Sequence, residues 1–259
     1  MPAIDGARPG RQPWGMGRDP PGETLRYEAD GLSMLGGLHR PAGAGTTPGV
    51  LVFPEAAGLG AHTLARAGQV ARELGYVALA CDLWGERREI EGLEAVTSAR
   101  AALWADPPGL RARVTAPLAA LRAQPGVDAS RIAAIGFCSG GTMAFELATC
   151  SDIRAAVGFH PGLHVPSLPR DAHRITASIL ALLGDEDPSV RPAARKAFAQ
   201  ALSAAGVDWQ ITLYGGVVHS FTNKDAHQLA APPDFARYDP RADRRSWAQM
   251  AALLTEAFA

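Results

Sequence analysis

The chain has 259 residues, with 25 lysines and arginines against 26 aspartates and glutamates. A formal net charge of −1 provides no broad attraction to nucleic acid or to an anionic membrane, so we expect a small-molecule partner. No segment approaches the roughly 20 apolar residues of a membrane span, and the N-terminal stretch lacks the apolar core of a signal peptide. The sequence therefore predicts a cytoplasmic protein, either a monomer or a homodimer, with a substantial core.

Cysteine usage and the N-terminal composition set two further limits. The three cysteines, Cys81, Cys138 and Cys150, are odd in number and lack zinc-like spacing, so neither a disulfide framework nor a metal site is expected. Residues 1–22 contain five prolines and five glycines, which predicts a flexible leader. Residues 23–259 are predicted to form a single α/β domain.

The rest of the chain alternates between strand-like and helix-like segments. Residues 25–41 carry a central Asp30-Gly31 between partly alternating side chains, which predicts a β-hairpin. Later apolar runs predict strands at residues 50–54, 76–80, 131–137, 155–160, 177–184 and 209–214. Amphipathic patterns predict helices at residues 62–75, 192–206 and 244–258. This alternation indicates a mostly parallel sheet with helices on both faces, preceded by the hairpin.

Two segments are harder to interpret. Residues 86–124 are helical in composition but contain Pro107-Pro108 and Pro117, so we expect two or three helical pieces broken at these prolines. Residues 222–246 are longer than a plain connector needs. They form either a cover over a pocket or a surface excursion that leads to the last helix.

Residues 136–140, Gly-Phe-Cys-Ser-Gly, join a predicted strand to a predicted helix. The pattern has the G-x-nucleophile-x-G form of the sharp turn that carries the nucleophile in α/β-hydrolases, with Cys138 in place of serine. An alternative centred on Ser139 would need glycine at the position of Phe137. The following helix N-terminus favours a thiolate, and the Ser139 N–H can point at a developing oxyanion.

Candidate partners for Cys138 lie further along the chain, because the order in this fold is nucleophile, acid, histidine. Asp185, Glu186 and Asp187 directly follow a predicted strand, and His219 follows the next one in a glycine-rich loop. The carboxyl ends of parallel strands meet at one edge of the sheet. We therefore expect one of the three acidic residues, together with His219, to face Cys138.

Three further residues are weaker candidates. Glu55 directly follows the buried strand at 50–54, where a carboxylate is costly unless it is paired, and a thiol could be its partner. The alternative is an exposed loop glutamate. His62 and His160 are expected at most to line the pocket, and the remaining histidines are expected to be ordinary surface or packing residues.

Several separated segments resemble the dienelactone hydrolase family, the carboxymethylenebutenolidase-like branch of the α/β-hydrolases. They are VLVFPEAAGLGAHT, RELGYVALACDLWG, VDASRIAAIGFCSGG, LLGDEDPSV and VVHSFTN, and the resemblance runs from about Leu25 to the C-terminus. It implies an α/β-hydrolase fold and an ester or lactone hydrolase that needs no metal or organic cofactor.

The resemblance also implies roles for single residues. It implies a triad of Cys138, Asp187 and His219, because Gly184-Asp185-Glu186-Asp187 fits the family pattern; Asp185 remains a minor alternative. Glu55 matches the family's active-site glutamate.

Ala56 matches the residue whose N–H joins that of Ser139 in the oxyanion hole. In family members that open dienelactones, an arginine four residues after the catalytic histidine binds the substrate carboxylate, and here that position is Asn223. Phe221, Asn223 and Arg100 are the expected substrate contacts, and Lys224, Arg100 or Arg87 could replace the missing charge.

The sequence thus predicts a cysteine-dependent hydrolase that forms an acyl-enzyme. Acyl transfer or thioester hydrolysis with the same residues is the nearest alternative. A non-catalytic ligand receptor is a third alternative, although such receptors usually carry a broken triad.

Overall fold

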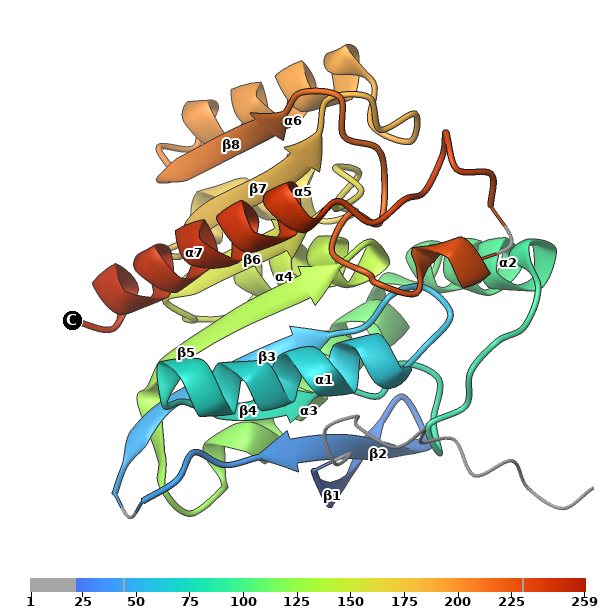
Figure 1. The fold of residues 1–259 in the computed structure, drawn as a ribbon. Coiled ribbons are helices and arrows are strands. Elements are labelled where there is room, and N and C mark those ends of the chain that lie inside the picture. The colour runs from blue at the N-terminus through green and yellow to red at the C-terminus, as the bar shows by residue number, and fades with distance from the viewer. Residues whose placement is uncertain (1–21, 44, 230) are drawn as a thin grey trace, which may run out of the picture.

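A computed structural model describes residues 22–43, 45–229 and 231–259. The predicted leader, apart from Gly22, lies outside the described residues. The strands are β1 (Glu23–Ala29), β2 (Leu32–His39), β3 (Thr47–Phe53), β4 (Val77–Ala80), β5 (Val127–Phe137), β6 (Ala155–Phe159), β7 (Ser178–Gly184) and β8 (Trp209–Tyr214). They form one sheet of eight strands in the order β1-β2-β4-β3-β5-β6-β7-β8 (Figure 1).

The predicted hairpin is confirmed and forms one edge of this sheet. Strands β1 and β2 pair antiparallel around Asp30 and Gly31, whose φ angles of 52° and 70° suit a tight two-residue turn. Strand β2 then pairs antiparallel with β4, whereas the other neighbours, from β4 to β8, run parallel. The expected mostly parallel sheet is therefore confirmed.

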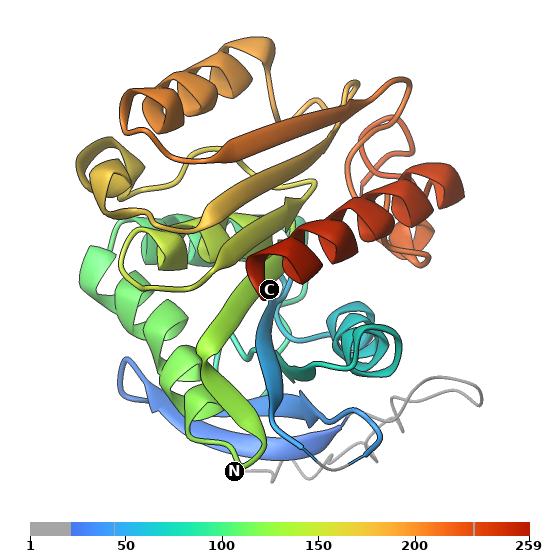
Figure 2. The same ribbon diagram turned by 90° about the vertical axis from the view of Figure 1, so that its left-hand side faces the viewer.

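Helices cover both faces of the sheet. They are α1 (Ala61–Gln69), which continues as the π-helical turn η1 (Val70–Leu74), α2 (Leu93–Trp104), α3 (Pro107–Arg122), α4 (Ser139–Ala148), α5 (Leu168–Asp171), η2 (Ala172–Arg174), α6 (Pro192–Ala204), η3 (Ala226–Gln228) and α7 (Pro240–Ala257). Figure 2 shows α1 and α7 on one face and α3, α4 and α6 on the other. Among the described residues, none of the helices has both the length and the apolar character needed to cross a membrane.

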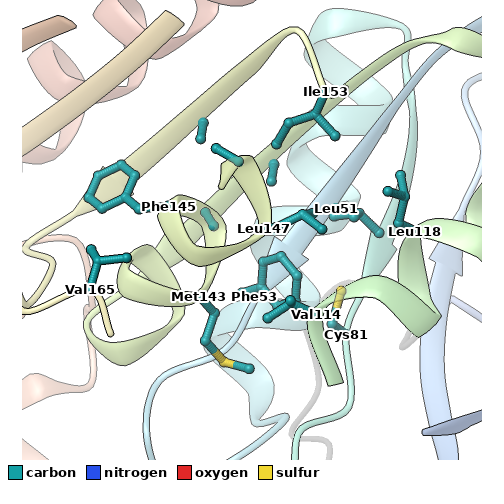
Figure 3. Packing of buried hydrophobic residues seen from close by; sticks show 14 of the residues in the cluster. Leu51, Phe53, Cys81, Val114, Leu118, Met143, Phe145, Leu147, Ile153 and Val165 are labelled. Carbon is teal, nitrogen blue, oxygen red and sulfur yellow. The ribbon is translucent and has the colours of Figure 1, made fainter. Parts of the chain in front are cut away.

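Side chains of the central strands alternate between two hydrophobic cores. On β3, Leu51 and Phe53 point into the core beneath α3 and α4, whereas Val50 and Val52 point into the core beneath α1 and α7. The first core contains Cys81 (Figure 3). Burial raises the pKa of its thiol well above the usual value, as expected for a cysteine that acts as a small hydrophobic residue.

The predicted break at Pro117 is wrong, because α3 runs through this residue. The chain breaks only before Pro107-Pro108, where Asp106 accepts a hydrogen bond from the Gly109 N–H at 3.2 Å and caps the helix. An internal proline costs a helix about 3 kcal/mol. Pro117 is buried, so its packing against the rest of the molecule offsets that cost.

The Asp82 carboxylate organises the loop that follows β4. It accepts hydrogen bonds of 2.8–3.1 Å from the backbone N–H groups of Leu35, Trp84, Gly85 and Arg87. The indole Nε1–H of Trp84 in turn donates to the Ala56 carbonyl at 2.9 Å. Asp82 therefore ties the hairpin to the segment that follows β3, where Glu55 and Ala56 lie.

We predict that Asp82→Ala lowers the free energy of unfolding by roughly 2 to 4 kcal/mol, because it leaves several N–H groups without their acceptor. Asp152 is a matched control, since its exposed carboxylate pairs with Arg122 near the surface. Asp152→Ala should change the stability by less than about 1 kcal/mol. Urea unfolding monitored by circular dichroism measures both values, and equal stabilities of the two variants would contradict the role given to Asp82.

Candidate active site

Cys138 occupies a strained turn between β5 and α4. Its φ of 53° and ψ of −119° lie in a region that side-chain-bearing residues seldom adopt. A Cβ added at Gly136 would lie 2.1 Å from the Gly140 backbone, and one added at Gly140 would lie 2.3 Å from the Phe53 carbonyl oxygen. The two glycines are therefore required because three backbone segments approach one another at this turn.

Cys138 is partly exposed as a residue, and the His219 ring acts electrostatically on its thiol. Burial by itself would raise the pKa of this thiol, but the positive charge and the hydrogen bond of the His219 ring bring it below the ordinary value. Burial likewise disfavours the charged form of His219, yet the charge of the Cys138 thiolate and the hydrogen bond that His219 donates to Asp187 raise its pKa. The pair therefore favours a thiolate beside an imidazolium.

Asp187, and not Asp185, contacts His219. The distance from Asp187 Oδ2 to His219 Nδ1 is 2.6 Å, and the N–H and hydroxyl of Ser189 donate to Asp187 Oδ1 at 2.8 and 2.6 Å. Asp185 pairs instead with Arg195 at 2.7 Å, and its side chain is half exposed. The structure thus brings Asp187 to His219, and the triad that they would form with Cys138 stays a prediction.

Glu55 is not an exposed loop residue. Its side chain is 20% exposed, and the Asn223 amide donates to its two oxygens at 3.2 and 3.4 Å. Burial raises the pKa of the Glu55 carboxyl, and the Asn223 hydrogen bond and the charge of His219 partly oppose this effect. The negative charge of Glu55 acts in turn to raise the pKa of Cys138, so the structure brings the carboxylate and the thiol into one site.

Ser139 and Ala56 lie on either side of the turn. Ser139 is the first residue of α4, so its N–H is one of the helix N-terminal donors without a partner in the helix. Its Oγ is 3.9 Å from the Cys138 sulfur. Ala56 is buried next to Glu55, and the Trp84 indole holds its carbonyl. Their oxyanion-hole role stays a prediction.

The structure does not support three of the expected substrate contacts. Phe221 is completely buried, and its ring packs against those of His160 and Tyr214, so it belongs to the core. The Arg87 guanidinium donates at 2.7 Å to two carbonyl groups of β2 and is occupied there. Arg100 is exposed on α2.

A cavity of about 670 Å³ lies between α1, α7 and the segment that follows His219. Its walls include His62 and Arg66 of α1, Asn223 and Lys224, and Trp247 of α7. Because Asn223 bonds Glu55, the cavity borders the site from the side of that carboxylate. Arg100 is not among its lining residues.

Part of the segment at 222–246 covers His219 and does not project away from the molecule. The carbonyl of Phe235 accepts the His219 N–H at 3.0 Å, and the rings of the two residues are 5.7 Å apart. The Arg237 N–H donates back to the His219 carbonyl at 3.1 Å. This two-sided pairing fixes the backbone of His219.

Sequence reasoning undervalued His160 and His62 and missed Thr222 altogether. All three lie within one connected group of buried polar side chains behind the turn. Thr222 stands only three residues after His219, but a threonine in a predicted loop gives no sign of complete burial. In the described part of the chain, no group of three or more His, Cys, Asp or Glu residues is arranged to hold a metal ion.

Comparison with known proteins supports the expected family. The sequence matches the model of the dienelactone hydrolase family over residues 34–258. A protein of Bradyrhizobium sp. named "Probable 2-oxo-3-(5-oxofuran-2-ylidene)propanoate lactonase" is 30% identical over 212 residues, which cover 78% of this chain and 85% of that protein.

Two solved structures with dienelactone hydrolase in their names or abbreviations resemble this chain in sequence and in fold. The crystal structure of a dienelactone hydrolase-like promiscuous phosphotriesterase from metagenomic libraries is 38% identical, with a TM-score of 0.85, and the match covers 92% of this chain and 98% of that one. A structure named m3DLH is 42% identical, with a TM-score of 0.87 and the same coverage. The expected α/β-hydrolase fold is thereby confirmed.

We predict that Cys138 is alkylated by iodoacetamide with a pH midpoint below the roughly 8.5 of a free thiol. The rate falls as the pH drops through this lowered pKa, because only the thiolate reacts. Asp187→Asn weakens the support of the His219 imidazolium and should raise the midpoint by about one pH unit. Asp185→Asn, which alters only a surface ion pair, should leave it unchanged.

Mass spectrometry of the labelled peptides separates Cys138 from Cys81 and Cys150, whose thiol pKa values burial raises. The same midpoint in both aspartate variants would argue against the contact between Asp187 and His219 as the support of the thiolate.

Proposed function

The chain belongs to the dienelactone hydrolase family and is a hydrolase of esters or lactones, and from this premise we propose that Cys138 is its nucleophile. Asp187 and His219 complete the proposed triad. The observation that carries the proposal is the 2.6 Å contact between Asp187 and His219, together with the strained turn that holds Cys138 between two glycines. The charge of His219 acts on the Cys138 thiol. The lowered pKa of the Cys138 thiol supports the same assignment.

In the proposed reaction, the Cys138 thiolate attacks the carbonyl carbon of an ester or lactone. The carbonyl oxygen takes the negative charge and accepts hydrogen bonds from the N–H groups of Ser139 and Ala56. The C–O bond then breaks, and the His219 imidazolium gives its proton to the departing alkoxide. The product of this half-reaction is an alcohol and an acyl group in thioester linkage to Cys138.

The second half-reaction releases the acid. His219, now neutral, takes a proton from water, and the resulting hydroxide attacks the thioester carbonyl. The C–S bond breaks, and the thiolate forms again beside the imidazolium. Throughout, Asp187 accepts a hydrogen bond from His219 Nδ1, which fixes the tautomer and stabilises the charged ring.

For the substrate, we propose neutral esters or lactones in preference to carboxylate-bearing dienelactones. Asn223 stands where family members that open dienelactones carry an arginine, and its amide donates to Glu55. Arg87 is occupied by carbonyl groups of β2, and Arg66, in the cavity wall, is paired with Asp243 at 2.5 Å. A cytoplasmic location and the state of assembly stay predictions of the sequence.

The direct test is mass spectrometry of the intact protein after it is mixed with a p-nitrophenyl ester. We expect an acyl adduct on Cys138 and its loss in Cys138→Ala, with hydrolysis reduced roughly 10⁴-fold or more. Cys150→Ala is the matched control and should retain both adduct and turnover. If Cys138→Ala kept near-normal turnover and Ser139→Ala lost it, the nucleophile would be Ser139 and not Cys138.

The charge preference has its own test, namely kcat/KM for a carboxylate-bearing dienelactone against its methyl ester. A missing charge-assisted hydrogen bond weakens binding by roughly 1.5 to 3 kcal/mol, or about 10- to 150-fold. We therefore expect the wild type to prefer the methyl ester and Asn223→Arg to shift the preference toward the free acid. A strong wild-type preference for the acid, unaltered in Asn223→Arg, would place the anion site on another residue.

A further inference from the structure

Three polar side chains, two of them completely buried, connect the backbone of Cys138 with the neighbourhood of Glu55. The Cys138 N–H lies 3.2 Å from His160 Nδ1, and His160 Nε2 lies 2.8 Å from Thr222 Oγ1. Thr222 Oγ1 is 3.5 Å from His62 Nε2, and His62 Nδ1 is 3.8 Å from Glu55 Oε1. His160 and Thr222 are completely buried. The proposed reaction assigns these three side chains no step.

The tautomer of His160 follows from its contact with the Cys138 N–H. The Cys138 N–H is shared between the Phe159 carbonyl oxygen at 3.0 Å and His160 Nδ1 at 3.2 Å. Because a backbone N–H can only donate, His160 Nδ1 faces it with a lone pair, which gives a neutral ring with its proton on Nε2. His160 Nε2–H therefore donates to Thr222 Oγ1, and the Thr222 hydroxyl proton is free to point onward. His160 also has a φ of 41°, so the fold holds it in a conformation uncommon for histidine.

The tautomer of His62 follows from its contact with Arg66. Arg66 Nε can only donate, and it lies 3.4 Å from His62 Nε2, so this nitrogen must carry a lone pair. The Thr222 hydroxyl lies 3.5 Å from the same nitrogen and shares its single lone pair with Arg66 Nε–H. His62 is therefore neutral with its proton on Nδ1.

His62 Nδ1 is buried and has no hydrogen-bond partner in the structure, although it faces the Glu55 carboxylate. A buried N–H without an acceptor is costly, and a shift of the Glu55 side chain toward it would form a hydrogen bond. Burial followed by the charge of Arg66 lowers the pKa of His62 to about 3, and burial followed by the charge of His219 lowers that of His160, which agrees with two neutral rings.

We propose that His160, Thr222 and His62 form a positioning chain, in which donors all point one way from the Cys138 N–H to Glu55. The inference rests on the proposed function, because it assigns the chain the task of fixing the nucleophile and the active-site carboxylate relative to each other. His160 accepts the N–H of the strained turn, and His62 offers its N–H to Glu55. Thr222 links the two rings, since its hydroxyl accepts a hydrogen bond from His160 and donates one toward His62.

The first experiment determines the tautomers of His160 and His62 in the wild-type protein without any substrate. In protein labelled with ¹⁵N at its histidines, the ring nitrogen shifts distinguish the two neutral tautomers and the cation, and His160→Asn and His62→Asn assign the signals. At pH 7 we expect His160 protonated only at Nε2 and His62 only at Nδ1. The opposite tautomer, or a cation, at either residue would overturn the proposal.

The second experiment interrupts the chain at its middle. Thr222→Val keeps the shape and removes the hydroxyl, and we expect kcat to fall about 10- to 100-fold with KM little changed, because the reacting groups lose alignment. The rate of Cys138 alkylation at pH 7 should fall with it. Thr222→Ser should restore both. Thr149→Val removes another completely buried hydroxyl, at the end of α4, and should alter neither.

The outcomes separate this inference from the proposed function. Wild-type tautomers as expected, with no acyl adduct on Cys138, would reject the nucleophile and keep the hydrogen-bond order from Cys138 to His62 without its positioning task. Normal kcat and alkylation in Thr222→Val, with an adduct on Cys138, would reject the chain and leave the nucleophile standing. If Thr222→Val does not fold, the wild-type tautomers together with Thr222→Ser still decide, because serine keeps the hydroxyl and loses only the methyl group.

Discussion

The close backbone approach at the end of β5 is the constraint on which the site depends. Gly136 and Gly140 let the turn fold over itself and against the end of β3, where a single added Cβ would collide. This contact puts the thiol at a helix N-terminus and next to the segment that carries Glu55. The residues that determine reactivity are therefore assembled by atoms that take no part in the chemistry.

Charge next to the thiol is arranged around the His219 ring. His219 lies between the Cys138 thiolate and the Asp187 carboxylate, with Glu55 acting on it from nearby. The two other histidines of the site stay neutral, which spares His219 the repulsion of a second cation at a ring separation of 5.0 Å from His160. The His219 ring thus favours its charged form and the rings of His160 and His62 their neutral form, because different groups surround each ring.

Local patterns in the sequence predicted most of the fold and the central part of the site. Buried strands, amphipathic helices, the Asp30-Gly31 hairpin and the turn at Cys138 each carry a short-range signal in hydrophobic period or in glycine position. Chain order alone could not choose between Asp185 and Asp187, since their difference is the tertiary partner, Arg195 for one and His219 for the other. The sequence also carried no sign that Pro117 and Phe221 are buried. We therefore expected a helix break at Pro117 and a substrate contact at Phe221.

The lowered pKa of the Cys138 thiol favours the thiolate, which is the form of cysteine that oxidants attack. Thiolates react with peroxides to give sulfenic acids, and a neighbouring thiol normally rescues that state as a disulfide. Among the chain's three cysteines, Cys81 is enclosed in the core, and Cys150 lies two residues beyond α4, a helix about 15 Å long. An oxidised Cys138 therefore has no partner within its own chain, and its recovery depends on small thiols that can enter the site.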